Sequence, residues 1–462
     1  MHFEEIKIKE RRVSLLICTV LTMVVQALSS ISSSVHANES IEAENTAPDT
    51  AVDSLTPLDE ALTQPEDEKP ILFKWLPDRV KDMQPVLRDA TFKIKFRAYG
   101  FDRERTNNQP DNANTLGGEI FFETGKFLQN VQLGMSYYSS NLFGNSEDPG
   151  RTGLVAPNGD DINVLGQAYL LLGDADGWQA SLYRRSINVP YLDADDNRMI
   201  PRTHESYFIT RNGERNDIGF GHITRTKPKN SDHFISMSEA AGALNTDKGL
   251  SIVGGKFEVH DNANVGVFNY YGWDTFNTLY AEANWASYVL KSLGTKVGLQ
   301  YTDQRSVGDQ LVDEFHTSHV GIKGSGSVNG MVLTLAYTQV GDDASIRFPW
   351  GGFPSYNWAM IEDFNRPGER AWRFGFSFSG TEWGRPAWSG FVNFTRGSDA
   401  HDESSGSAAA DVNESAITFD YKPKSGKLKG LWLRFRTGRA EFNDGTDVSN
   451  ARVIVNYSLP IL

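Results

Sequence analysis

Basic side chains occur at every second position in two apolar stretches of the sequence. They are Lys93, Lys95 and Arg97 within Thr91–Phe101, and Arg434 and Arg436 within Gly430–Gly438. Successive side chains of a β-strand point to opposite faces, so each stretch is predicted to be a strand with one cationic and one apolar face. Ammonium and guanidinium groups in a row can bind carboxylates and other anions in turn.

The two faces of these strands are predicted to meet lipid on one side and water on the other. A lysine or arginine that faces lipid near the middle of a bilayer costs about 2–4 kcal/mol. Three on one strand would cost on the order of 6–12 kcal/mol, which is comparable with the stability of a whole domain. The apolar residues Phe92, Ile94 and Phe96 are therefore expected to face lipid. By the same alternation, the charged residues expected to face the interior also include Arg373, Glu119, Glu123 and Asp420.

The rest of the chain supplies the strands that such a wall needs. Alternating stretches recur from Thr91 to Leu459, about eighteen in all, and Asp232–Glu239 is predicted to be one of them. Short turns, such as TKPKNS before Asp232, follow every even-numbered stretch. The longer connections are expected at Asp102–Leu116, Asn141–Asp160, Ile187–Arg215, Gly341–Glu369 and Gly397–Glu414.

This arrangement of turns and loops is typical of membrane barrels, whose long loops lie outside the cell. The predicted fold class is all-β: a transmembrane antiparallel up-and-down β-barrel of about 18 strands with inward-folded constriction loops. A soluble β-sandwich is the alternative. After residue 30 the sequence has no apolar run long enough to cross a bilayer as a helix.

Closure of the barrel would bring the first and last strands together, and with them their charges. The predicted pore-lining basic ladder comprises Lys93, Lys95, Arg97, Arg373, Arg434, Arg436 and Arg452. The predicted pore-lining acidic residues are Glu119 and Glu123, which lie beside the ladder on the second strand, and Asp420. We interpret the ladder as a path along which anionic groups cross a water-filled pore. The alternative is a set of ordinary solvated lumen charges, partly neutralised by the two glutamates.

A barrel of this size leaves an open channel unless a segment narrows it. Two long connections, Ile187–Arg215 and Gly341–Glu369, combine charged or aromatic residues and are candidates for folding inward. The candidate constriction residues are Arg185, Tyr191, Asp193, Asp196, Arg198, Arg202, His204, Tyr356 and Asn357. Flexible loops exposed outside the cell are the alternative.

The N-terminal region has the features of an export signal followed by a linker. Basic residues precede the apolar run Val13–Leu28, and Val35-His36-Ala37 offers a small-residue cleavage site, which predicts a signal peptide over residues 1–37. An uncleaved membrane anchor is the alternative. Residues 38–87 are acidic and predicted to be largely disordered, with a short amphipathic piece at Phe73–Leu87. Residues 88–462 are predicted to form the barrel.

The composition argues against several other classes of protein. A net charge of -14 argues against nucleic acid as a partner. The only cysteine, Cys18, lies in the predicted signal, so the mature chain is expected to lack disulfides and cysteine-ligated metals. His316 and His319 would point to opposite faces of a strand, and we expect no metal, cofactor or catalytic residue. A barrel hydrolase assembled from separate strands and a secreted carbohydrate-binding or hydrolytic domain are the alternatives.

Three segments carry a family resemblance. The first contains Arg185-Ser186, Pro190-Tyr191-Leu192, Asp196-Asn197-Arg198, Ile200-Pro201 and Thr203; the second contains Pro354-Ser355-Tyr356-Asn357, Asp363-Phe364-Asn365, Gly368-Glu369 and Trp372; the third is the terminal RVIVNYSLPIL. These segments resemble the OprD family of outer-membrane porins. The likeness extends over about Arg88 to Leu462, and Arg202 and His204 stand where some members have glutamine and phenylalanine.

The resemblance implies a monomer-sized pore in the bacterial outer membrane, narrowed by inward loops and lined by a basic ladder. Such a channel passes small hydrophilic solutes by substrate-selective diffusion: carboxylates, amino acids or, in some members, chito- or other oligosaccharides. Its other expected partners are outer-membrane lipid and lipopolysaccharide and, during biogenesis, the barrel-assembly machinery. We expect a monomer or a loose trimer.

Overall fold

The computed structural model describes residues 73, 75–106, 108–128, 130–174, 176–290 and 293–462. All of them belong to one compact unit, Gln64–Leu462. The predicted signal peptide and the acidic segment up to residue 72 lie outside the described residues. Two short helices, α2 (Leu76–Val80) and α3 (Pro85–Arg88), precede the first strand. None of the helices in the described ranges is long and apolar enough to cross a membrane.

Strands dominate the described part of the chain. They are β1 (Thr91–Arg105), β2 (Asp111–Glu123), β3 (Val131–Leu142), β4 (Ile162–Gly173), β5 (Trp178–Arg185), β6 (Thr203–Arg211), β7 (Asn216–Lys227), β8 (Ile235–Ser236), β9 (Leu250–His260), β10 (Ala263–Gly272), β11 (Phe276–Leu290), β12 (Leu293–Ser306), β13 (His316–Val328), β14 (Met331–Val340), β15 (Arg370–Ser379), β16 (Trp388–Ser398), β17 (Val412–Tyr421), β18 (Leu431–Phe442) and β19 (Asp447–Pro460). Between them lie α4 (Met237–Ala240) and two 3₁₀ turns, η1 (Pro149–Thr152) and η2 (Gly380–Trp383).

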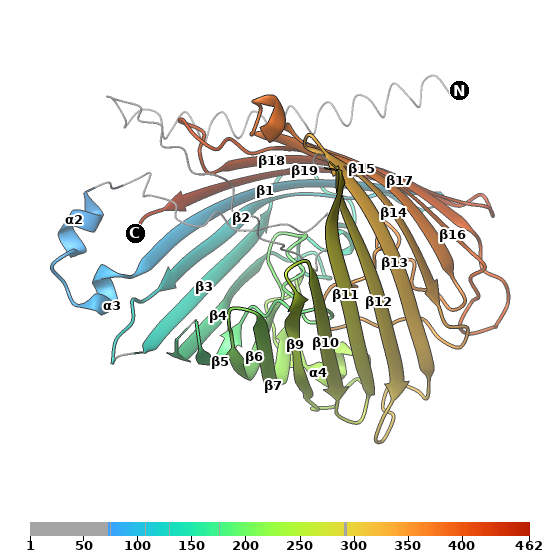
Figure 1. Cartoon of the computed structure of the whole chain (residues 1–462), viewed down its shortest axis with the longest axis horizontal. Helices are drawn as coiled ribbons and strands as arrows, with labels where there is room; N and C mark the ends of the chain where they lie inside the picture. The colour runs from blue at the N-terminus through green and yellow to red at the C-terminus, as the bar shows by residue number, and fades with distance from the viewer. Residues whose placement is uncertain (1–72, 74, 107, 129, 175, 291–292) are drawn as a thin grey trace. The chain divides into compact units, whose positions relative to one another are not determined.

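The strands close into an antiparallel barrel. Apart from the short β8, each strand pairs with the next along the chain, with β7 pairing to β9, and β1 pairs with β19 from Lys93 opposite Pro460 to Arg105 opposite Val448 (Figure 1). Nineteen strands of the described residues belong to the sheet, but β8 pairs only with the end of β7, so the other eighteen form the wall. Closure satisfies the backbone groups of both edge strands. The predicted all-β barrel is confirmed.

Two predicted elements are wrong in a way that leaves the strand count unchanged. Thr203–Arg211 is β6, whereas we expected it to be part of a loop, because its polar residues hide the alternation of Tyr207 and Ile209 on the outer face. The expected strand Asp232–Glu239 is mostly not a strand: only β8 is extended, and α4 follows it. The expected short turn after Thr226 is therefore the start of the long connection 228–249.

The connection between β1 and β2 is also shorter than expected. β1 extends to Arg105 and β2 begins at Asp111, so most of the expected loop Asp102–Leu116 is strand. Asp111 is fully buried and forms ion pairs with Arg103 (2.7 Å), Arg105 (2.5 Å) and Arg151 (3.2 Å). These pairs hold the two strands together beyond the apolar part of the wall.

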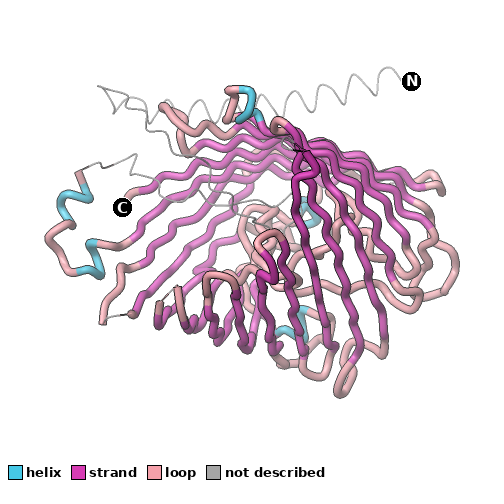
Figure 2. The backbone as a smooth tube through the Cα atoms, viewed as in Figure 1, coloured by secondary structure: helices cyan, strands magenta, loops and turns pink. Residues whose placement is uncertain are grey.

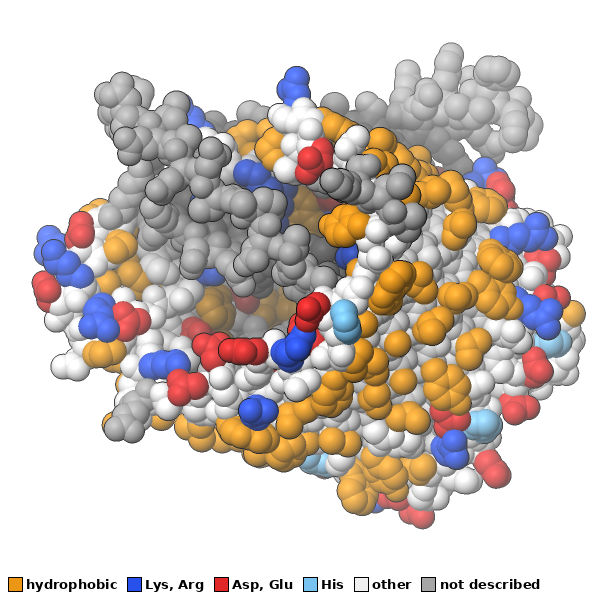
Figure 3. All heavy atoms as spheres, viewed as in Figure 1, with side chains coloured by type: hydrophobic (Ala, Val, Ile, Leu, Met, Phe, Trp, Pro, Cys, Tyr) orange, Lys and Arg blue, Asp and Glu red, His pale blue; other side chains and the backbone are white. Residues whose placement is uncertain are grey.

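The outer face of the wall is apolar, as a lipid-facing surface must be. Phe96, Leu335 and Phe374 are among its exposed side chains. Figure 3 shows hydrophobic side chains spread over the outer wall and charged side chains around a hollowed mouth. On the opposite parity, inward charges meet one another, as where Lys95 stands opposite Glu119 in the β1–β2 register.

Two of the connections run inside the barrel. We name residues 186–202, between β5 and β6, loop L3, and residues 341–369, between β14 and β15, loop L7. Figure 2 shows loop segments within the ring of strands. Buried L3 residues such as Tyr191 and L7 residues such as Trp350 share one hydrophobic cluster with inward residues of β10 and β11. The predicted inward folding of the loops is confirmed.

Candidate functional site

A tight turn begins the course of L3 across the lumen. Pro190 and Tyr191 are the central residues of a turn closed by the amide of Leu192, which donates to the carbonyl of Val189 (3.0 Å). Tyr191 has φ 61, a conformation that glycine or asparagine adopts more easily in this position. Its buried ring and a 2.9 Å hydrogen bond between its hydroxyl and Thr302 of β12 hold it there. Packing thus maintains a locally strained backbone.

L3 and L7 are joined to each other by polar contacts as well as by aromatic packing. The carboxylate of Asp193 accepts from the amide of Gly352 (2.7 Å), and Arg202 donates to the carbonyl of Pro349 (2.7 Å). Burial, together with the neighbouring Asp195, raises the pKa of Asp193 to about 6. The Tyr191 and Phe353 rings lie 6.1 Å apart. The two loops therefore form one layer across the barrel.

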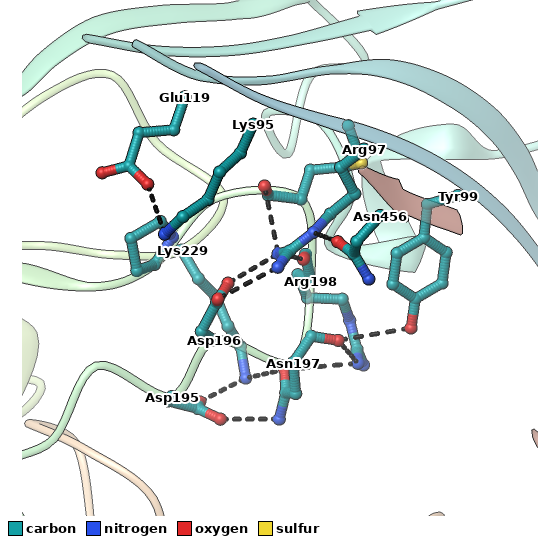
Figure 4. Close-up of polar contacts among 12 residues, drawn as sticks. Lys95, Arg97, Tyr99, Glu119, Asp195, Asp196, Asn197, Arg198, Lys229 and Asn456 are labelled. Carbon is teal, nitrogen blue, oxygen red and sulfur yellow. Dashed lines mark hydrogen bonds and ion pairs between the residues drawn. The ribbon is translucent and has the colours of Figure 1, made fainter. Parts of the chain in front are cut away.

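On the other side of the lumen, L3 meets β1 through an arginine (Figure 4). Arg97 forms a bidentate pair with Asp196 (2.6 and 3.0 Å) and donates to the carbonyl of Arg198 (2.5 Å). Its Nε donates to Asn456 of β19 (2.7 Å). Arg198 itself reaches the carbonyl of Thr152 (3.0 Å). L3 thus spans the lumen from β1 to β12.

The inward cations of β18, β19 and β1 lie on neighbouring strands. Arg436 stands opposite Arg452 in the β18–β19 register, and Arg452 stands opposite Phe101 of β1. Arg434, Arg97, Lys95 and Lys93 follow at successive inward positions toward the short-turn end. Inward positions two residues apart are separated by about 7 Å. We name Lys93, Lys95, Arg97, Arg434, Arg436 and Arg452 the basic arc.

Carboxylates accompany several members of the basic arc. Lys95 pairs with Glu119 (2.9 Å), and Arg434 forms a bidentate contact with Asp420 (2.7 and 2.9 Å). Glu123 accepts from the hydroxyl of Tyr169 (2.7 Å), and the guanidinium of Arg185 lies 5.2 Å from the Tyr169 ring. The structure thus places all three predicted acidic residues on the inner wall.

Two members of the predicted ladder contact L7 directly. Arg373 donates to the carbonyls of Asn357 (3.1 Å) and Trp358, and to the hydroxyl of Thr395 (3.2 Å). Arg452 donates to the carbonyl of Met360 (2.9 Å). Both side chains are buried. Their guanidinium groups therefore hold the L7 backbone.

The remaining loop candidates differ in position and exposure. Arg185 and His204 belong to β5 and β6 rather than to a loop, and His204 is fully buried against the carbonyl of Trp350 (3.2 Å). Asn357 is fully buried too and donates to Thr338 (2.9 Å) and the carbonyl of Ala371 (2.7 Å). These contacts give His204 and Asn357 the role of loop supports.

Tyr356 contacts two charged residues of the wall, of which the sequence pattern had placed Lys323 on the inner face but had not selected Glu282. Its hydroxyl donates to Glu282 (3.1 Å), and the ammonium of Lys323 lies 4.2 Å from its ring. Glu282 shares the inward parity of Tyr280 and Asn284 in β11, which is the signal that could have identified it. Another such residue, Glu414 of β17, accepts from three L7 amides.

Comparison with known proteins identifies the family. The model of the outer membrane porin OprD family matches residues 184–461. This chain belongs to the OprD family. Membership places the protein in the bacterial outer membrane as a channel for small solutes, and members of this family are channels rather than enzymes. Comparison with curated protein sequences gave no match.

Solved structures share the fold of this OprD-family chain at low sequence identity. Pseudomonas aeruginosa OccK9 (OpdG) is 19% identical, with a TM-score of 0.74, and the match covers 82% of this chain and 100% of that one. P. aeruginosa OpdK, solved with vanillate, is 19% identical with a TM-score of 0.73, covering 81% and 100%. Acinetobacter baumannii OccAB1 is 15% identical with a TM-score of 0.73, covering 83% and 99%.

Proposed function

We propose that this porin favours small solutes that bear a carboxylate, and that the basic arc guides them past L3 and L7. The observation that carries the proposal is the continuous placement of inward cations on β18, β19 and β1, at the level where L3 crosses the lumen. The inward positions of Arg97 and Lys95 on β1, like those of Arg436 and Arg434 on β18, are about 7 Å apart, so an anion that leaves one cation finds another nearby on the same strand. Electrostatic attraction then lowers the barrier to entering a narrow passage.

The carboxylates beside the arc suit transport rather than tight binding. Glu119 and Asp420 each form an ion pair with a cation that a passing anion would also contact. A solute must therefore compete with a resident carboxylate at Lys95 and Arg434, which keeps its residence at each step short. Conduction requires sites that are attractive enough to enter and weak enough to leave.

The solute class is proposed on chemical grounds. Arginine matches the planar geometry of a carboxylate with paired N–H donors. Vanillate, with which OpdK was solved, is itself a carboxylate, and that likeness supports the proposal. Amino acids fit the same arc through their carboxylate. Uncharged oligosaccharides do not gain from it, and their preferential uptake would contradict the proposal.

Neutralising two cations of the arc tests this function. We expect the double variant Arg434→Gln/Arg436→Gln to lose much of its anion preference, because two adjacent inward charges disappear. The measurement is the reversal potential of single channels in a salt gradient, which should shift toward zero. Arg439→Gln is the matched control, since Arg439 lies on the same strand with an exposed side chain (58%). Unchanged reversal potentials in the double variant would overturn the proposal.

A further inference from the structure

A single carboxylate of the barrel wall holds a turn of L7 by its backbone. Glu414 is 1% exposed, and its Oε1 accepts from the amides of Met360 (2.8 Å) and Ile361 (3.1 Å). Its Oε2 accepts from Ile361 (3.2 Å) and Glu362 (2.8 Å). Successive backbone N–H groups that converge on one anion form a concave site of fixed geometry. Here the anion belongs to the wall and the N–H groups belong to the loop.

Two arginines hold the same segment from strands on either side of β17. Arg373 of β15 and Arg452 of β19 donate to L7 carbonyls at residues 357, 358 and 360. The wall therefore binds carbonyl groups as well as amide groups of residues 357–362. All of these contacts use the L7 backbone, so they fix the position of the segment whatever its side chains are.

We propose that Glu414 is a positioning residue that keeps L7 across the lumen and so sets the width of the channel. Without this carboxylate, the buried N–H group of Met360 and the partly buried N–H groups of Ile361 and Glu362 lose their acceptor, and an unpaired donor away from water is costly. The segment recovers hydrogen bonds by moving into the water of the lumen, which leaves the wall there uncovered. The inference concerns channel width and does not depend on the solute class proposed above.

The first test is the conductance of Glu414→Gln in planar bilayers. The amide keeps the size of the side chain but puts an NH₂ group where an oxygen accepted an N–H. We expect a higher single-channel conductance than in the native protein, and faster entry of larger sugars into liposomes. Glu441→Gln is the matched control, because Glu441 on the adjacent strand β18 has an exposed side chain (55%). Unchanged conductance and size limit in a folded Glu414→Gln barrel would overturn the proposal.

A cross-link provides the rescue that distinguishes L7 movement from general loosening. A Cβ atom at Gly438 would lie 3.3 Å from the sulfur of Met360, so the side chain at position 360 of L7 packs against β18. In the variant Met360→Cys with Gly438→Cys, a short bis-methanethiosulfonate reagent can join the two thiols and tie the loop to β18. Added to Glu414→Gln, this link should restore the native conductance, and its reduction should abolish the restoration. A widened channel that the link leaves unchanged, with the cross-link shown to have formed, would overturn the role of L7.

Folding of each variant is checked by the shift in electrophoretic mobility that heating causes in a folded barrel. If Glu414→Gln does not fold, Glu414→Asp replaces it, since the shorter side chain keeps the charge but cannot reach all three amides. The conductance of Glu414→Asp should exceed the native value. An unchanged conductance in this variant would overturn the proposal. The residues of the basic arc are intact in every one of these variants. A negative result here would therefore refute the role of Glu414 without refuting the proposed anion preference.

Discussion

Charged residues inside the barrel fall into two groups according to what their side chains contact. Lys95, Arg97 and Arg434 pair with carboxylates that line the lumen or lie on L3. Arg373, like Glu414, contacts mainly the backbone of L7. The first group can exchange partners with a solute, because a carboxylate competes for the same donors. The second group cannot do so without releasing the loop.

The pH dependence of stability should show that one ionised carboxylate in L7 is unfavourable in the folded protein. Burial and the nearby Glu414 raise the pKa of Glu362 from 4.5 to about 7, and Asp363, Arg366 and Glu369 also face it. The folded protein therefore holds this proton more tightly than the unfolded chain, so stability falls as pH rises from about 4.5 to about 7. We expect Glu362→Gln to melt higher than the native protein near pH 8 and at the same temperature near pH 4.

The measurement is the temperature at which the folded electrophoretic band is lost, at each pH. Glu382→Gln is the control, because Glu382 lies in the exposed turn between β15 and β16. Equal melting temperatures of the Glu362 variant and the native protein near pH 8 would show that the ionised carboxylate at this position does not destabilise the fold.

At the scale of elements, aromatic packing makes L3, L7 and the inner wall one unit. Trp350 of L7 stacks on Phe276 of β11, with ring centroids 4.7 Å apart, and donates from Nε1 to the carbonyl of Met237 in α4 (2.9 Å). It is 1% exposed. One side chain thus joins L7 to a strand and to the connection between β7 and β9.

We expect Trp350→Ala to destabilise the barrel by about 3–5 kcal/mol, the usual cost of deleting a large buried aromatic side chain. The free energy of unfolding in urea, with the protein in lipid vesicles, measures the loss. Trp383→Ala should cost much less, because Trp383 in η2 is exposed (48%). A similar loss in both variants would mean that the loop layer contributes little to stability.

For the whole barrel, parity along each strand decides which substitutions the wall accepts. Phe374 of β15 lies on the apolar outer face, whereas Ser377 has the inward parity of Arg373 on the same strand. We expect Phe374→Lys to destabilise the protein in lipid vesicles by about 2–4 kcal/mol, because the ammonium must face acyl chains. Ser377→Lys should change stability far less, since its ammonium faces water. Equal effects measured by urea unfolding would contradict the assigned faces.

The alternation of residue types determined the fold class and the two faces of the wall. It did so because the pleat of a strand is a local property, and a buried or lipid-facing cation is costly wherever it occurs. The same rule placed Lys95, Arg97 and Arg434 inside, before any contact was known. It failed for β6, where polar residues hide the alternation of Tyr207 and Ile209 on the outer face, and for Asp232–Glu239, where only Ile235 and Ser236 are extended.

Only the tertiary structure decided what each inward residue does. Arg97 meets Asp196 across 99 residues of sequence, and Arg452 meets Met360 across 92. Such pairs depend on barrel closure and on the path of L3 and L7 through the lumen. Neither of these produces a repeating pattern of residue types in the sequence. Arg373, Arg452 and Glu414 therefore hold L7 for reasons of geometry that residue type and spacing do not contain.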